Sequence, residues 1–273
     1  MGKVKIKRKS TLIDMTAMSD VTVLLLTFFM LTSTFLQKEP VQVETPSSVQ
    51  EQKVSDSNVV NVLVSPHGEV FLSVAGEADP DASVAYAKEL NPDMSAAELR
   101  KEKGKWASDS VRKDAIMQFQ QDYNETAKNK VQLTVDEVAQ LAKLGTIAVP
   151  FADVKKFLAL SQVEQDKIFT EFNKLSDEEK EAYNKNPNNV RVGIPIDTDK
   201  GHTNEFQMWM RAIKKVAQGN YPKLNEALVK GEGIAVKADK NTAFDKMHTV
   251  LDNLQTLKMT RFTLMTALKS QDE

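Results

Sequence analysis

The stretch Met15–Leu36, MTAMSDVTVLLLTFFMLTSTFL, contains one charged residue, Asp20, in a predominantly apolar run. A helix rises about 1.5 Å per residue, so these 22 residues reach about 33 Å, enough to cross a hydrocarbon layer of ~30 Å. The stretch therefore predicts a transmembrane helix. No second apolar run of this length occurs in the sequence, which predicts a single-pass protein.

Two other interpretations of this stretch remain open. A cleaved signal peptide has an apolar region of about 7–15 residues followed by small residues, whereas this run is longer and ends Ser-Thr-Phe-Leu. A buried core helix is the second alternative. We expect an uncleaved anchor. Basic residues precede the span without any acid up to residue 13, so the positive-inside rule predicts a cytoplasmic tail at 1–14 and residues 37–273 on the other side. The basic residues are Lys3, Lys5, Lys7, Arg8 and Lys9, and Lys38 alone follows the span closely.

Asp20 lies about five residues, or roughly 7 Å, into the predicted span. An ionised carboxylate near the centre of a membrane helix costs about 2.5–3.5 kcal/mol. One interpretation is that Asp20 lies near the headgroups and is tolerated there. We favour a carboxylate that faces protein or water in a helical assembly, where burial raises its pKa and lets it exchange a proton. Steps of 4, 7 and 7 residues place Thr16, Thr27 and Thr34 near the face of Asp20, which predicts a polar stripe.

A polar linker and a folded domain are expected after the span. Residues 37–57 are rich in Pro, Ser, Gln and Glu, which is typical of an extended segment without a core. This segment is either a passive tether or an ordered docking segment. In the domain, 58–273, two β-branched runs flank the turn sequence Ser-Pro-His-Gly at 65–68 and predict a β-hairpin.

The C-terminal part predicts a strand–helix–strand unit with a parallel strand pair. Its strands are expected at 233–238 and 261–266, and its helix is expected to start at a Thr242 cap. Asp239 is expected to fix the turn after the first strand. Helical apolar spacing also predicts an amphipathic helix from Phe206 to Val216, and a helix whose core face includes Phe244.

The region of about 77–190 lies between these two β parts and carries four capping-box patterns, each a Ser or Thr followed three residues later by Glu. We expect a helical insertion, which serves either as a partner-binding surface or as a packing elaboration. The four pairs are Ser95–Glu98, Thr134–Glu137, Ser161–Glu164 and Ser176–Glu179.

Several function classes are not expected. The 273-residue chain has a formal net charge of −2, which does not suggest a nucleic-acid partner. The absence of cysteine excludes disulfides and thiolate metal sites. The three histidines, His67, His202 and His248, have no second ligand at metal spacing, so no metal site is expected. No Ser, His and acid set is recognisable, and the sequence predicts no enzyme.

The run Asp14–Val21, DMTAMSDV, followed by Leu24–Met30, LLLTFFM, resembles the N-terminal signature of the ExbD/TolR biopolymer-transport family. In that family Thr-Pro-x-x-Asp precedes a Leu- and Phe-rich span. The segment Val41–Pro46, VQVETP, is similar to the short extended segment after the family's helix, and residues 236–264 resemble the C-terminal half of its periplasmic domain. Two departures are visible, because Ala17 stands in place of the usual Pro and Ser19 in place of an apolar residue.

The resemblance implies a single-pass transmembrane helix plus an α+β periplasmic domain, with a small mixed sheet and helices on one face, here carrying the helical insertion. It implies an ExbD-like subunit of the bacterial inner membrane that harvests proton flow through Asp20, with protons as the coupling ion and no cofactor. Thr16, Thr27 and Thr34 would be its pore-facing companions, and Val41, Val43 and Pro46 would form a docking segment.

The implied partners are a second copy of the chain, a pentameric ExbB-like channel protein and a TonB-like energy transducer for outer-membrane transport. Two alternatives stay open. A TolR-like subunit would use the same proton chemistry for envelope integrity. A signal-anchored periplasmic binding module would have no ion role.

Overall fold

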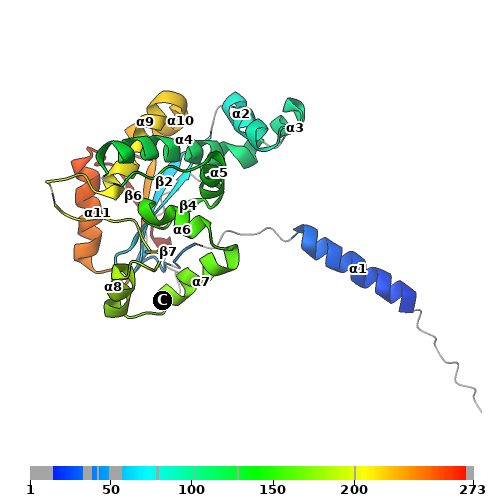
Figure 1. Cartoon of the computed structure of the whole chain (residues 1–273), viewed down its shortest axis with the longest axis horizontal. Coiled ribbons are helices and arrows are strands. Elements are labelled where there is room, and N and C mark those ends of the chain that lie inside the picture. Colours follow the sequence, from blue (N-terminus) through cyan, green and yellow to red (C-terminus); the bar gives the residue numbers. More distant parts are fainter. Residues whose placement is uncertain are drawn as a thin grey trace, which may run out of the picture. The chain divides into compact units, whose positions relative to one another are not determined.

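The computed structural model describes residues 15–32, 39–41, 43–48, 57–77, 80–101, 103–127, 129–199 and 201–268. The chain divides after Lys38 into two units. The first contains helix α1, Met15–Thr32, and the second contains a domain with a five-stranded mixed sheet surrounded by helices (Figure 1).

Helix α1 covers most of the predicted span, but its last four predicted residues, Ser33–Leu36, lie outside the described residues. Within the part of the chain that the structure describes, no helix has both the length and the apolarity required to cross a membrane. The single-pass topology therefore stays a prediction.

The main sheet has five strands in the order β4-β3-β2-β5-β6. The β2–β3 pair is the predicted antiparallel hairpin, and β4 continues it in antiparallel sense. Strands β2, β5 and β6 run parallel, so the predicted parallel βαβ unit is confirmed. A separate parallel pair joins β1 to β7. The strands are β1 Ser47–Ser48, β2 Val59–Val64, β3 Val70–Ala75, β4 Thr146–Ile147, β5 Ile234–Ala238, β6 Thr263–Leu264 and β7 Ala267–Leu268.

A helical block separates β3 from β5, and only β4 interrupts it with a strand among the described residues. All four capping-box pairs interact. In each pair the Glu carboxylate accepts a hydrogen bond from the backbone N–H of the Ser or Thr. The hydroxyl groups of Ser95, Thr134 and Ser161 accept in turn from the backbone N–H of their Glu partners. The block contains α2 Pro80–Leu90, α3 Ala96–Lys101, α4 Lys103–Thr126, α5 Val135–Lys143, the 3₁₀ turn η1 Phe151–Asp153, α6 Val154–Leu158, α7 Gln162–Phe172 and α8 Asp177–Lys185. It is followed by α9 Glu205–Asn220, α10 Pro222–Lys230 and α11 Phe244–Thr256.

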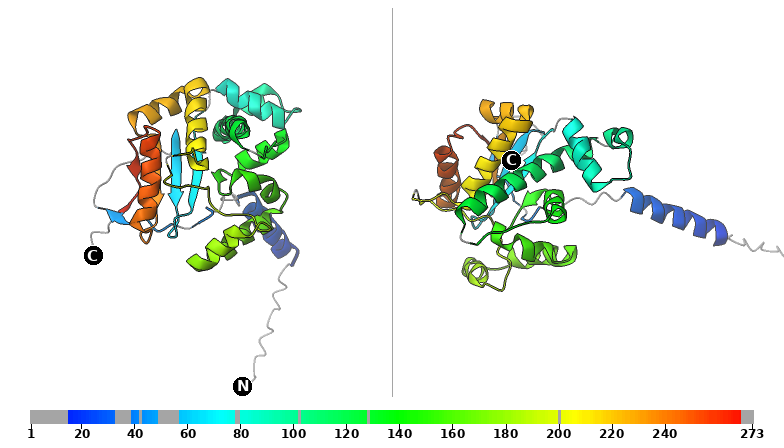
Figure 2. Two further views of the ribbon diagram at one scale, coloured as in Figure 1. Left: turned by 60° about the vertical axis from the view of Figure 1, so that its left-hand side comes forward. Right: turned by 45° about the horizontal axis from the view of Figure 1, so that its top comes forward.

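The main core lies on one face of the sheet, where α4, α9 and α11 pack (Figure 2). Alternate residues of β2 and β3, among them Val62 and Leu72, point to this face, since side chains alternate along a strand. Phe119 of α4 stacks on Trp209 of α9 with ring centroids 3.7 Å apart. This stack joins the two longest helices of the domain at the centre of the core.

The opposite face of the sheet is also covered, which corrects the expectation of helices on one face only. Leu63 and Phe71 are opposite each other on β2 and β3 and point away from the main core. They form a second buried cluster with Phe172 of α7, and Tyr183 of α8 packs against it. The near-continuous apolar runs of β2 and β3 agree with this, because strands buried on both faces lack strict polar alternation.

Two local predictions around α11 were wrong. Thr242 does not cap the helix, because its hydroxyl donates instead to the Ser65 carbonyl at 3.1 Å and the residue before the helix is Ala243. Phe244 is 79% exposed, although its helical spacing predicts a core position. It stands in the first turn of α11, ahead of the buried residues Val250 and Leu254.

Candidate functional site

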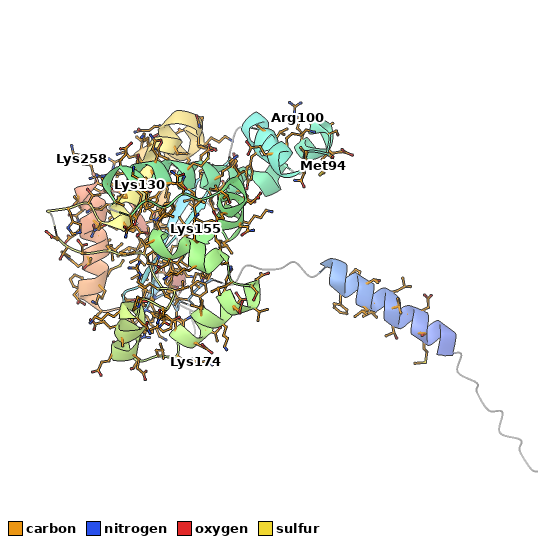
Figure 3. All side chains as sticks on the ribbon, viewed as in Figure 1. Met94, Arg100, Lys130, Lys155, Lys174 and Lys258 are labelled. Carbon is orange, nitrogen blue, oxygen red and sulfur yellow. The ribbon has the colours of Figure 1, made fainter. Side chains whose placement is uncertain are left out.

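Helix α1 presents large apolar side chains over most of its circumference. The side chains drawn on α1 in Figure 3 project outward from the helix. Its large side chains between Met18 and Phe29 are 49–62% exposed, so α1 buries none of them within the described residues. A helix that is apolar over most of its circumference normally lies inside protein or membrane. This surface therefore needs a cover from outside α1.

The polar groups of α1 differ in how they are paired. The Thr27 hydroxyl donates to the Leu24 carbonyl at 2.9 Å, and the Thr22 hydroxyl donates to the Met18 carbonyl at 2.8 Å. These bonds satisfy both hydroxyl protons inside the helix, which makes them tolerable in apolar surroundings. Asp20 is exposed and has no hydrogen-bond or ion-pair partner among the described residues. It is therefore the polar group of α1 that most needs an outside partner.

The predicted polar stripe is described only in part. Asp20 and Thr27 are seven residues apart on a regular helix, so they share one face. Thr16 lies in the first turn of α1, and Thr34 lies outside the described residues.

The predicted docking segment lies against its own domain. Val41 is 5% exposed and belongs to the second buried cluster, Val43 packs against that cluster, and Pro46 is exposed. The Glu44 N–H donates to a carboxylate oxygen of Asp239 at 2.8 Å, and the Lys240 N–H donates to the Glu44 carbonyl at 2.8 Å. The segment is therefore held by both apolar and backbone contacts.

Ion pairs and a strand pair extend this docking. Lys237 pairs with Glu39 at 3.1 Å, and Lys240 pairs with Glu44 at 2.6 Å. The β1–β7 pair then joins residues 47–48 to the C-terminal strand. We name residues Glu39–Ser48, apart from Gln42, the docked linker.

Asp239 connects the predicted turn to the docked linker. One of its carboxylate oxygens accepts from the Asn241 N–H at 2.8 Å, which confirms that Asp239 fixes the turn after β5. The other oxygen binds the Glu44 N–H, 195 residues away in the sequence. Sequence reasoning missed this second role, since no local pattern relates the two positions.

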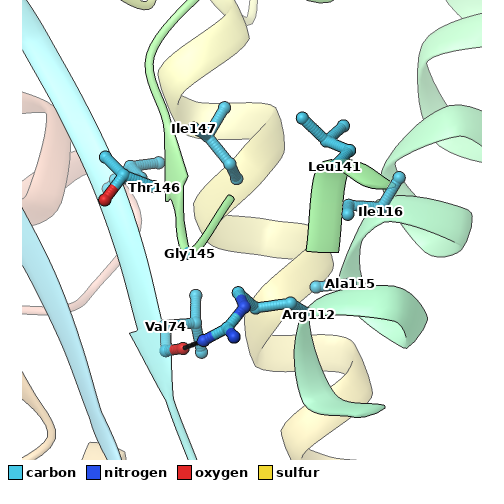
Figure 4. Close-up of a pocket in the computed structure, with 9 residues that line it drawn as sticks. Val74, Arg112, Ala115, Ile116, Leu141, Gly145, Thr146 and Ile147 are labelled. Atoms are coloured by element: carbon cyan, nitrogen blue, oxygen red, sulfur yellow. Dashed lines mark hydrogen bonds between the residues drawn. The ribbon is translucent and has the colours of Figure 1, made fainter. Parts of the chain in front are cut away.

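A small cavity lies between β3, α4 and α5 (Figure 4). Its volume is about 10 Å³, which is at the lower limit for one water molecule. The Arg112 guanidinium at its edge donates to the Val74 carbonyl at 3.0 Å and to the Ala142 carbonyl at 2.6 Å. Arg112 therefore acts as a structural crosslink, and the cavity has no room for a small-molecule ligand.

A more open cleft of about 300 Å³ lies beside the β2–β3 turn. Its polar lining groups already have protein partners. Arg191 pairs with Asp153 at 2.7 Å, and the Asn184 side chain bonds both the N–H and the carbonyl of Val192. These polar groups therefore hold the surrounding loops together, and their contacts do not indicate a ligand site.

Glu205, the first residue of α9, is a second carboxylate of interest. One of its oxygens accepts from the Phe151 N–H at 2.8 Å and from the Trp209 indole N–H at 3.4 Å. Burial raises the pKa of Glu205 to about 7, against the opposing effect of these hydrogen bonds and the nearby Arg191 charge. Sequence reasoning missed this group, because a Glu in the first turn of a helix is ordinary.

Comparison with known proteins gives one result. A family model described as biopolymer transport protein ExbD/TolR matches residues 7–147, just over half of the chain. The matched part includes α1 with Asp20, the docked linker and the β2–β3 hairpin, and it ends at β4. No curated protein and no solved structure matches the chain.

Proposed function

Because the chain belongs to the ExbD/TolR family, we propose that it is a subunit of a proton-driven motor in the bacterial inner membrane. The family supports a role in biopolymer transport, and its members are transport accessory proteins. The observation that carries the specific proposal is Asp20, an unpaired carboxylate within the described residues on a helix whose other faces carry large apolar side chains.

The proposed topology rests on the sequence. The described helix has 18 residues and a length of about 27 Å, and residues 33–36 would extend it to the length of a span. The basic tail before the helix supports a cytoplasmic N-terminus. Residues 37–273 would then lie in the periplasm.

In the proposed mechanism, Asp20 takes a proton from the outer side of the membrane and releases it inward. Each proton that crosses supplies about 2.3 kcal/mol per 100 mV of membrane potential. Protonation removes the charge of Asp20 and changes which polar groups it prefers. Thr27 is a suitable companion, because its hydroxyl proton is bound to Leu24 while its lone pairs can still accept a hydrogen bond. Thr16 and Thr34 would continue this face.

The proposed partners cover the apolar surface of α1. Two copies of the helix would lie inside a pentameric ExbB-like channel, with Asp20 facing polar groups of the pore. The docked linker, with Val41 and Val43 buried, would carry motion of the helix pair to the domain and on to a TonB-like transducer. The coupling ion is the proton.

The test replaces Asp20 with Asn, which keeps the size of the side chain and removes its proton exchange. We expect Asp20→Asn to abolish cargo uptake across the outer membrane, with unchanged membrane insertion and unchanged co-purification with the channel protein. Asp20→Glu, which keeps a carboxylate, should retain part of the uptake. Normal uptake by the Asn variant would overturn the proposal.

The same strains distinguish the branches of the family. If deletion of the gene causes detergent sensitivity without an uptake defect, and Asp20→Asn reproduces it, the proton chemistry serves envelope integrity as in TolR. If Asp20→Asn has no phenotype and no channel protein co-purifies, the chain is an anchored binding module without an ion role.

A further inference from the structure

Phe172, the last residue of α7, is the centre of the second buried cluster. It is 0% exposed and shares this cluster with Val41 of the docked linker and with Leu63 and Phe71 of the sheet. Helix α8 packs on the same ring, because Tyr183 meets it edge-on with centroids 5.5 Å apart. Phe172 therefore joins two helices, the sheet and the linker at one point.

A hydrogen bond at the end of α7 also attaches the linker backbone to this helix. Asn173, which follows Phe172 directly, donates its side-chain N–H to the Pro40 carbonyl at 2.9 Å. The bond holds the linker backbone one residue before Val41 enters the buried cluster. The linker is therefore held at two adjacent residues, by a hydrogen bond to the Pro40 backbone and by packing of the Val41 side chain.

The α7–α8 pair has its own attachments to the rest of the domain. His67, in the β2–β3 turn, contacts Asp177 in the first turn of α8. Asn184, near the end of α8, holds the backbone of Val192. Because these contacts do not involve the linker, the helix pair can stay in place when the linker leaves.

We propose that α7 and α8 form a clamp that holds Pro40, Val41 and Val43 of the docked linker against the second face of the sheet. Release of the linker from this clamp, here called the α7–α8 clamp, would leave both helices and the main core in place. The clamp lies beyond residue 147, outside the part of the chain that the family model matches. The clamp gives part of the helical block a role in holding the linker. A role of the clamp in energy transfer would rest on the proposed function, whereas the clamp itself does not.

The test uses the absence of cysteine in the chain, so that one introduced cysteine is the only thiol. In the purified full chain, Val41→Cys should react slowly with a maleimide. Pro46→Cys, at an exposed linker position, should react fast. In the Val41→Cys background, Asn173→Ala should raise the rate about threefold, the effect of one partly exposed hydrogen bond. Phe172→Ala should raise it toward the rate of Pro46→Cys.

Lys174→Ala is the matched control, because Lys174 is exposed and directly follows Asn173 (Figure 3). It should leave the rate at Val41→Cys unchanged. Tryptophan fluorescence checks that the Phe119–Trp209 stack persists in every variant. Equal rates at the two cysteine positions would overturn the proposal, as would rates at Val41→Cys that ignore both Asn173→Ala and Phe172→Ala. Asp20→Asn should not change these maleimide rates. The rates therefore test the clamp alone, and the uptake assay tests the motor proposal.

Discussion

Glu205 should make the stability of the domain depend on pH near neutrality. Its carboxylate is held inside the domain by the Phe151 N–H and the Trp209 indole, and burial raises its pKa from the ordinary 4.5 to about 7. In the unfolded chain the group ionises near pH 4.5, while in the folded chain it keeps its proton until about pH 7. The folded state therefore binds more protons between these values.

The sign and size of the effect follow from this difference. Stability falls as pH rises wherever the folded state binds more protons than the unfolded state. The contribution of Glu205 is thus complete below pH 4.5 and is lost by about pH 7. The pKa difference corresponds to about 3 kcal/mol, and the partial solvent contact of the residue reduces this to roughly 2 kcal/mol.

The variant Glu205→Gln removes this titration and keeps an oxygen that can accept from Phe151. Denaturant unfolding of the full chain in detergent, followed by tryptophan fluorescence, would measure the free energy of unfolding at pH 4, 5, 6, 7 and 8. Relative to the Gln variant, the unchanged protein should lose about 2 kcal/mol from pH 4 to pH 8. Glu125→Gln, at an exposed position of α4, should follow the unchanged protein. Parallel curves for the unchanged and Glu205→Gln proteins would refute the reasoning.

Two further stability predictions concern the helices. Asn253→Ala in α11 should cost about 3 kcal/mol in the free energy of unfolding, because the buried Asn253 amide bonds the side chains of Asn204 and Gln207 and the Asp197 carbonyl. Chemical denaturation measures this cost, and an effect no larger than that of the exposed Gln255→Ala would contradict it. Thr134→Ala should cost about 1 kcal/mol by removing the N-cap of α5. Thermal unfolding should show a lower midpoint than for Thr170→Ala, an exposed threonine within α7, and equal midpoints would count against the cap.

Features specified by neighbouring residues were predictable from the sequence. The β2–β3 hairpin follows from a turn sequence between two β-branched runs, and the capping boxes follow from pairs three residues apart. The family was recognised from Asp14–Met30, and the match over residues 7–147 confirms it. Asp20 stood out because a charge inside an apolar run is unusual.

Contacts between distant parts of the chain were not predictable. The bonds from Asn173 to Pro40 and from Glu44 to Asp239 join residues 133 and 195 positions apart, and no periodicity marks such pairs. The covering of the second sheet face depends on how α7 folds back, which local propensity does not determine. Thr242 shows the same limit, because tertiary packing directs its hydroxyl to Ser65 instead of to the helix.

The parallel pairing of β2 with β5 has a consequence for how the chain reaches its folded state. Val60 lies opposite Ile234, about 170 positions later in the sequence. At roughly 5–20 residues per second, the ribosome needs on the order of 9–35 s to produce the partner of β2. Until then the hairpin can form locally, but one edge of β2 remains unpaired and its apolar side chains remain exposed. Such long-range pairing is slow and exposed to aggregation, so we expect the nascent domain to depend on protection by chaperones until β5 has been made.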